Sequence, residues 1–177
     1  AEAAAELRRR INIYHMENGV TMIDPAATYI DAGVMIGQDT VLYPNCVLEG
    51  TTVIGSNCTI YGGSRIADCI VADNTKIDAG VLAHAVVGSH TAIGPFSHLR
   101  PKTKIGDHCR VGNFVEIKNV SVGDGSKVSH LTYCGDGEIG KNCNLGCGVV
   151  FVNYDGTHKH RTVVEDGVFI GCNANLV

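Results

Sequence analysis

The chain has 177 residues, of which 45% are hydrophobic and 18% charged, and its formal net charge is −4. This composition is that of a folded globular domain and excludes a disordered chain, and the lack of a clustered basic face argues against a nucleic-acid partner. Because no apolar stretch is long enough to span a bilayer and the start AEAAAELRRR lacks the apolar centre of a signal peptide, we expect a cytoplasmic protein with no membrane partner.

The N-terminal segment predicts a single helix. Residues 3–16 are rich in strong helix formers, and Leu7, Ile11 and Tyr14 recur near helical spacing. Gly19 is placed to end the helix. We therefore expect a short linker helix within residues 1–19, followed by one domain over residues 20–177.

Beyond residue 20 the sequence repeats every six residues. Aliphatic side chains stand six apart in two uninterrupted series: Ile30, Ile36, Leu42, Leu48, Ile54, Ile60 and Ile66, and then Val87, Ile93, Leu99, Ile105, Val111 and Ile117. A unit of six fits one short strand and one corner of a coil, so three units make a turn and residues 18 apart stack at about 4.8 Å. The pattern predicts an all-β fold, a parallel β-helix whose interior consists of aliphatic ladders.

The largest break in the repeat predicts a projecting loop. The period is lost after Val150 and resumes at Val164, which leaves the segment NYDGTHKHR, residues 153–161, out of register. Loops held by a rigid scaffold are frequent carriers of function. We therefore expect this insertion to contribute to the functional site.

Cysteine and histidine spacing gives no metal site. Cys46, Cys58, Cys109 and Cys143 each occupy the fifth place of a hexapeptide, where small side chains fill the interior, and no C-x-x-C pair is present. The eight histidines include one pair 18 apart, His90 and His108, which we expect to stack on a solvated edge. No metal is predicted.

Two cations are brought together by the repeat alone. Arg100 and Lys118 are 18 apart, so the period predicts that they stack on neighbouring turns. Two positive charges side by side favour an anion between them, and a guanidinium matches the geometry of a phosphate group.

Three segments carry a family resemblance: FSHLRPKTKIGDHCRVGNFVEIKN, SKVSHLTYCGDGEIGKNCNLGCG and FVNYDGTHKHRT. In this order they resemble the C-terminal acetyltransferase domains of the bacterial family of bifunctional N-acetylglucosamine-1-phosphate uridylyltransferases/glucosamine-1-phosphate acetyltransferases, which are hexapeptide-repeat acyltransferases. The likeness covers nearly the whole chain and includes the lead-in RRRINIYHMENGVTMIDP, similar to the family's linker helix.

The resemblance implies a left-handed coil, a homotrimer with sites between subunits, and a defined reaction. That reaction transfers an acetyl group from acetyl-CoA to the amine of glucosamine 1-phosphate, for the synthesis of UDP-N-acetylglucosamine and cell-wall precursors. It needs a base to take the proton of the attacking amine, and histidine titrates in the right range for this role.

The resemblance also implies roles for particular residues. His130 corresponds to the catalytic base, and Glu116 to an acid that orients it. The family's substrate-binding residues match Arg100, Lys118, Tyr133, Asn144 and Lys159, and its acetyl-CoA-binding residues match Asn153, Tyr154, Cys147 and Cys172. Cysteine is about as small as the residues that other members carry at these last two places, so both cysteines are predicted to line the groove and not to act as nucleophiles.

Two features leave alternatives open. The chain stops inside a repeat at Val177, whereas the family continues for further coils that complete the CoA groove, so we expect an incomplete C-terminal end. The glycine-rich nucleotide-binding start of the partner domain is absent as well, so uridyl transfer is not expected on this chain. The alternatives are a non-catalytic module for trimerisation and sugar-phosphate binding, and another hexapeptide enzyme, either a different acyltransferase or a zinc hydratase.

Overall fold

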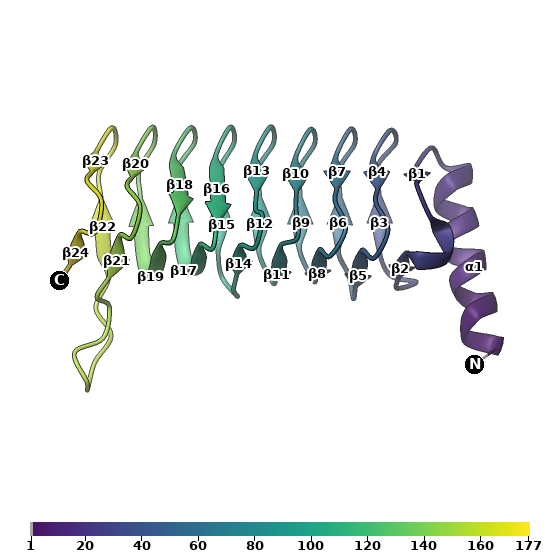
Figure 1. The fold of residues 1–177 in the computed structure, drawn as a ribbon, viewed down its shortest axis with the longest axis horizontal. Helices are drawn as coiled ribbons and strands as arrows, with labels where there is room; N and C mark the ends of the chain where they lie inside the picture. The colour runs from purple at the N-terminus through teal and green to yellow at the C-terminus, as the bar shows by residue number, and fades with distance from the viewer. Residues whose placement is uncertain (1) are drawn as a thin grey trace.

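The computed structural model describes residues 2–177 and shows a left-handed parallel β-helix with one helix at its N-terminal end (Figure 1). Helix α1 (Glu2–Glu17) leads into the first strand of the coil, and a short 3-10 helix, η1 (Pro25–Ala27), follows that strand. The sequence prediction of the fold class is thereby confirmed. Within the described residues, no helix is long and apolar enough to cross a membrane.

Each turn of the coil contributes one short strand to each of three faces. The first face contains β1 (Thr21–Met22), β4 (Val41–Leu42), β7 (Thr59–Ile60), β10 (Lys76–Ile77), β13 (Ala92–Ile93), β16 (Arg110–Asn113), β18 (Lys127–His130), β20 (Asn144–Leu145) and β23 (Phe169–Ile170). The second contains β2 (Tyr29–Ile30), β5 (Val47–Glu49), β8 (Arg65–Ala67), β11 (Val81–Ala83), β14 (His98–Leu99), β17 (Glu116–Val122), β19 (Tyr133–Ile139), β21 (Val150–Phe151) and β24 (Asn175–Leu176).

The third face contains β3 (Met35–Ile36), β6 (Val53–Ile54), β9 (Ile70–Val71), β12 (Val86–Val87), β15 (Lys104–Ile105) and β22 (Thr162–Val164). Strands β17 and β19 are seven residues long and bend around the corner between the second and third faces, so they pair with both. All strand pairs in the coil are parallel, as a helical path with one strand per face requires.

The backbone conformation at the corners of the coil explains which residue types occur there. Asn57, His90, His108 and Asn142 occupy the fourth place of their hexapeptides, and each has a positive φ of 54° to 56°. Asparagine and histidine tolerate this left-handed conformation better than most other non-glycine residues. His90 and His108 stack with their ring centroids 4.9 Å apart, which confirms the predicted edge pair.

The stacking interval is not constant along the coil. It is 18 residues from Leu99 to Ile117, as the period predicts, but 17 from Ile117 to Cys134. It is 25 from Leu145 to Ile170, because the projecting loop lies within that turn. The shorter interval follows from the dropped residue that the sequence shows as a slip in the repeat after Ile117.

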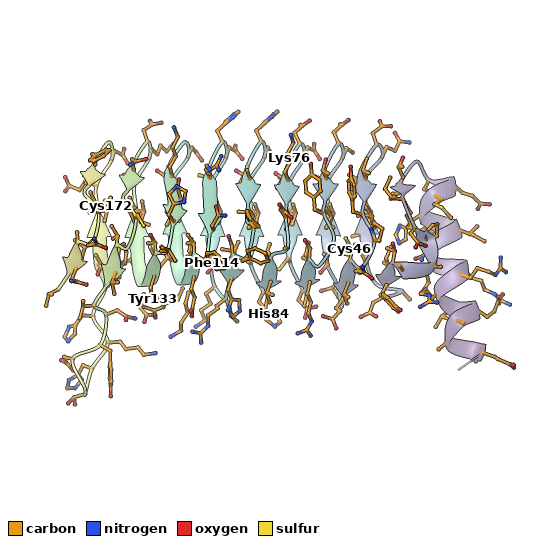
Figure 2. The ribbon with its side chains drawn as sticks, viewed as in Figure 1. Cys46, Lys76, His84, Phe114, Tyr133 and Cys172 are labelled. Atoms are coloured by element: carbon orange, nitrogen blue, oxygen red, sulfur yellow. The ribbon has the colours of Figure 1, made fainter. Side chains whose placement is uncertain are left out.

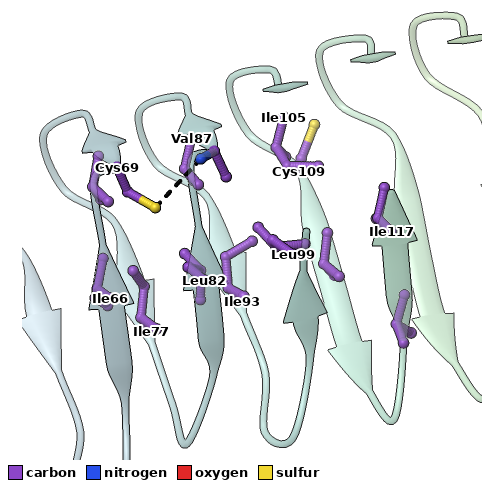
Figure 3. Close-up of a cluster of buried hydrophobic side chains, with 14 of the residues drawn as sticks. Ile66, Cys69, Ile77, Leu82, Val87, Ile93, Leu99, Ile105, Cys109 and Ile117 are labelled. Carbon is purple, nitrogen blue, oxygen red and sulfur yellow. Dashed lines mark hydrogen bonds between the residues drawn. The ribbon is translucent and has the colours of Figure 1, made fainter. Parts of the chain in front are cut away.

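The interior is a stack of aliphatic and small side chains (Figure 3). The cysteines at the fifth hexapeptide place are buried, as predicted, and they share the interior with Cys69 and Cys134. Burial raises the pKa of Cys46 to about 11 and that of Cys134 to about 12, so these thiols stay protonated. The Cys69 thiol also accepts a hydrogen bond from the backbone N–H of Ala85, shown as the dashed line in Figure 3.

The predicted N-terminal helix buries polar side chains. Leu7 and Tyr14 are 57% and 62% exposed, whereas Asn12 and His15 are buried. The amide of Asn12 donates hydrogen bonds to the carbonyl oxygens of Pro25 and Thr28, at 2.8 and 3.0 Å. The helix therefore meets the first turn through these polar contacts as well as through Ile11 and Met16, which pack against the core. Gly19 (φ 91°) follows the end of the helix as predicted.

The predicted loop projects from the C-terminal part of the coil, between β21 and β22 (Figure 1). Its base is closed by an antiparallel bridge between Tyr154 and Lys159. At its tip the carboxylate of Asp155 accepts hydrogen bonds from the backbone of Thr157 and His158 and contacts the His160 ring at 2.7 Å. These bonds depress the pKa of Asp155 and give the loop a defined shape.

Candidate active site

Arg100 and Lys118 lie on neighbouring turns, as the period predicts. Strand β14 pairs with β17 so that Leu99 lies opposite Ile117, and the ladder continues because the Arg100 backbone N–H donates to the Ile117 carbonyl at 2.8 Å. The same register, carried on to β19, sets Glu116 opposite Tyr133. Four of the predicted site residues thus share three successive turns of the second face.

Arg100 and Glu116 form an ion pair on this face. A guanidinium nitrogen of Arg100 donates to Oε1 of Glu116 at 2.8 Å, and both side chains are 40% exposed. Exposed pairs of this kind contribute little to stability, so the bond chiefly orients the guanidinium. The carboxylate predicted to orient His130 therefore has Arg100 as its hydrogen-bonding partner.

Gly135 leaves room for a group of polar side chains on the next turn. A Cβ added to Gly135 would meet the Tyr133 hydroxyl and would lie 2.7 Å from Nδ2 of Asn153. The tyrosine ring thus folds back over the glycine toward the base of the loop, and Asn153 is 7% exposed beneath it. The absence of a side chain at Gly135 makes this convergence possible.

Two lysines from different elements lie close together. Lys118 comes from β17 and Lys159 from the loop, and the neighbouring ammonium group of Lys118 lowers the pKa of Lys159. Like charges at close range disfavour double protonation, which is the physical cause of this shift. We call Lys118, Tyr133, Asp136, Asn153 and Lys159 the Gly135 cluster.

Asp136 belongs to the Gly135 cluster although it is not among the site residues predicted from the sequence. Its two carboxylate oxygens accept hydrogen bonds from the amides of Asn119 at 2.8 Å and Asn153 at 2.6 Å, and Lys118 Nζ lies 3.9 Å away. Burial works against ionisation of Asp136, but these hydrogen bonds and the charges of Lys118 and Lys159 hold its pKa below the usual value. The signal in the sequence is a 17-residue interval that joins residues 119, 136 and 153.

His130 lies at the corner that precedes Tyr133. Its side chain is exposed, while its carbonyl oxygen accepts hydrogen bonds from the Thr132 hydroxyl at 2.7 Å and the Gly148 N–H at 3.3 Å. Extending the register of β18, β20 and β23 places His130, Cys147 and Cys172 in one column on successive turns. The two cysteines of this column are the ones that are not buried.

The remaining two predicted residues lie outside the Gly135 cluster. Asn144 belongs to β20 on the first face, opposite Lys127 and Phe169. Tyr154 is 55% exposed at the base of the loop, and its hydroxyl donates to the Gly156 carbonyl at 2.6 Å. Figure 2 shows Tyr133 and Cys172 toward the C-terminal end of the coil, where this group of residues gathers.

A small hollow of about 170 Å³ adjoins the Gly135 cluster and is lined by Lys102, Asn119, Ser121, Asp136, Gly137 and Arg161. Larger hollows of about 430 and 460 Å³ lie against helix α1, far along the coil from the cluster.

Among residues 2–177, no group of three or more histidine, cysteine or acidic side chains is arranged to hold a metal ion.

Comparisons with known proteins agree with this architecture. The model of the bacterial transferase hexapeptide (six repeats) matches residues 84–119, and that of the GMPPB C-terminal domain matches residues 30–100. The chain is 56% identical over its full length to the bifunctional protein GlmU of Clostridium beijerinckii and, likewise, to that of a Geobacillus species. It spans 39% of the length of each of these relatives and corresponds to their C-terminal part.

A solved structure with a similar fold is the UDP-N-acetylglucosamine acyltransferase of Campylobacter jejuni. The two chains superpose with a TM-score of 0.54 at 19% identity, over 85% of this chain and 66% of that one. At this level of identity the likeness concerns the coil alone.

Proposed function

The chain belongs to the family of the C-terminal, hexapeptide-repeat part of the GlmU proteins, and from this premise we propose that it is a glucosamine-1-phosphate N-acetyltransferase. It would transfer an acetyl group from acetyl-CoA to the amine of glucosamine 1-phosphate and yield N-acetylglucosamine 1-phosphate. The observation that carries the proposal is the Gly135 cluster, in which two lysines from distant segments converge beside Tyr133, with Arg100 on the turn before.

The Gly135 cluster fits the phosphate end of the substrate. A phosphate monoester carries nearly two negative charges, and Lys118, Lys159 and Arg100 offer three positive ones from separate elements. Charge-assisted hydrogen bonds from such groups are about twice as strong as neutral ones. The cations lie on three different pieces of backbone, so they would surround the phosphate instead of contacting it from one side.

His130 is proposed as the base that makes the amine nucleophilic. The amine nitrogen attacks the thioester carbonyl carbon, a C–N bond forms, and the C–S bond breaks as the CoA thiolate leaves. His130 takes the proton from the nitrogen and can return it to the thiolate, so no covalent enzyme intermediate is needed. The imidazole is exposed at a corner next to Tyr133, within one turn of the cations that would hold the sugar.

Glu116 is proposed to accept a hydrogen bond first from Arg100 and then, once substrate is bound, from His130. The carboxylate now holds the guanidinium, and a bound phosphate would compete for that guanidinium. The freed carboxylate could then accept a hydrogen bond from the imidazole and stabilise its protonated form, which is the family role of this acid.

Acetyl-CoA is proposed to lie along the column that His130 begins. Cys147 and Cys172 continue this column. Their side chains are small, so they leave room along this corner of the coil for the extended acetyl-CoA molecule. Asn153 and Tyr154 at the base of the loop, and Asn144 on the first face, would contact the reacting acetyl group and the sugar. We further propose a homotrimer in the cytoplasm, with the loop reaching toward the neighbouring subunit.

The test of the proposal is the release of free CoA thiol in the presence of acetyl-CoA and glucosamine 1-phosphate. We expect turnover by the native protein, its loss in His130→Ala, and its retention in the control His108→Ala, which removes an exposed imidazole from a distant edge. Calorimetry that shows sugar-phosphate binding without acetyl-CoA binding would instead identify a non-catalytic binding module. Sedimentation at micromolar concentration tests the trimer, and a monomer would contradict it.

A further inference from the structure

Both carboxylate oxygens of the corner residue Asp136 accept hydrogen bonds from other side chains. Asp136 sits at the bend of β19 with a φ of 52°, a conformation that aspartate tolerates, and its side chain is 15% exposed. The carboxylate uses one oxygen for Asn119 and the other for Asn153. With both oxygens bonded, the orientation of the group is fixed by residues from the turns before and after it.

The contacts of Asp136 join two separate parts of the proposed phosphate site, strand β17 and the loop. Asn119 follows Lys118 in β17, so it ties the carboxylate to the strand that carries one cation. Asn153 lies at the base of the loop that carries the other cation, Lys159. The carboxylate thus spans the gap between coil and loop at the point where the two lysines meet.

The charge of Asp136 also bears on the lysines themselves. Lys118 and Lys159 repel each other, and the same contact that lowers the pKa of Lys159 would push the two side chains apart. Asp136 Oδ2 lies 3.9 Å from Lys118 Nζ and provides the opposing charge. An anion on one side of the pair lets both ammonium groups stay close before any phosphate is bound.

We propose that Asp136 is a positioning residue of the sugar-phosphate site: its carboxylate binds the Asn153 amide and lies beside Lys118, so that the cations are arranged before the substrate arrives. The inference rests on the proposed function. It assigns Asp136 no contact with the reacting atoms. Its effect should therefore appear in substrate binding, chiefly that of the sugar phosphate, and not in kcat.

The experiment compares Asp136→Asn with the matched control Glu138→Gln. Glu138 lies two residues further along the same strand, and its exposed carboxylate pairs with Arg161, outside the Gly135 cluster. Asparagine keeps the size and tolerates the left-handed corner but loses the charge and one acceptor. We expect the KM for glucosamine 1-phosphate to rise about tenfold in Asp136→Asn, with kcat within about twofold of the native value. Because Asp136 also holds the Asn153 amide, the KM for acetyl-CoA should rise too, but less than the KM for the sugar phosphate. Glu138→Gln should match the native protein.

A second variant separates positioning from folding. If Asp136 acts through Lys118, then Asp136→Asn should add less than about twofold to the KM of Lys118→Met, because the group it positions is already gone. A lower thermal midpoint of Asp136→Asn with an unchanged KM would show a purely structural corner residue and overturn the inference. A native protein that neither binds nor acetylates glucosamine 1-phosphate would overturn the proposed function itself.

Discussion

Cys134 and Phe151 are complementary in size, and this predicts an energetic coupling between them. They follow Tyr133 and Val150, which lie opposite each other in β19 and β21, so both point into the same ladder of the core. Cys134 is 0% and Phe151 1% exposed. A Cβ added to Gly137 would lie 3.1 Å from the Phe151 ring, so the ring also fills the room above that glycine.

The predicted costs follow from this packing. Cys134→Ile restores the aliphatic residue of the repeat but inserts extra carbon atoms next to the buried Phe151 ring, and overpacking costs about 1 to 3 kcal/mol. Phe151→Leu leaves an unfilled space and costs about 1 to 2 kcal/mol. In the double variant the larger isoleucine occupies part of the space that the smaller leucine leaves, so its destabilisation should be at least about 1 kcal/mol less than the sum of the two.

The assay is urea unfolding followed by circular dichroism, with all variants at one protein concentration because an oligomer would make stability concentration-dependent. In a temperature scan of the same samples, each kcal/mol should lower the thermal midpoint by about 2 to 4 °C for a chain of this size. The control pair is Leu82→Val with Phe151→Leu, which lie on well-separated turns and should be additive within about 0.5 kcal/mol. Additivity of Cys134→Ile and Phe151→Leu would refute the size complementarity.

Three further predictions concern accessibility, charge and space at the candidate site. In the native protein two of the eight thiols, Cys147 and Cys172, should react rapidly with a chromogenic disulfide reagent, and the other six should react only after unfolding. A third thiol that reacts rapidly in the folded protein would contradict the burial of the other six. Because Lys118 lowers the pKa of Lys159, kcat/KM for the sugar phosphate should fall as the pH rises through that lowered pKa. In Lys118→Met this fall should move to higher pH, and an unshifted pH profile would contradict the contact between the two lysines. Gly135→Ala should raise the KM for glucosamine 1-phosphate about tenfold by displacing side chains while the thermal midpoint changes little, and unaltered kinetics would show that the room above this glycine is not needed.

The coil itself could be predicted from the sequence because its rule is local. Leu99, Ile105 and Val111 each end up buried, since a six-residue interval returns the chain to the interior whatever lies several turns away. The stacking of Arg100 on Lys118 follows from three such units without a slip. Handedness did not follow from the period and came from the family resemblance.

Asp136 and the Gly135 cluster could not be predicted in the same way, because their positions depend on where the repeat fails. One residue is missing from the turn after Ile117, which changes the stacking interval from 18 to 17 and brings Asp136 between Asn119 and Asn153.

The sequence by itself thus determined a parallel coil, its aliphatic interior and the existence of a loop, because each depends on the spacing of neighbours along the chain. Only the tertiary structure decided that Lys159 lies near Lys118, that Glu116 is bonded to Arg100, and that the Asp136 carboxylate accepts hydrogen bonds from Asn119 and Asn153. Those contacts join segments from different turns, and the energy of such contacts depends on side-chain directions that no repeat of six residues specifies.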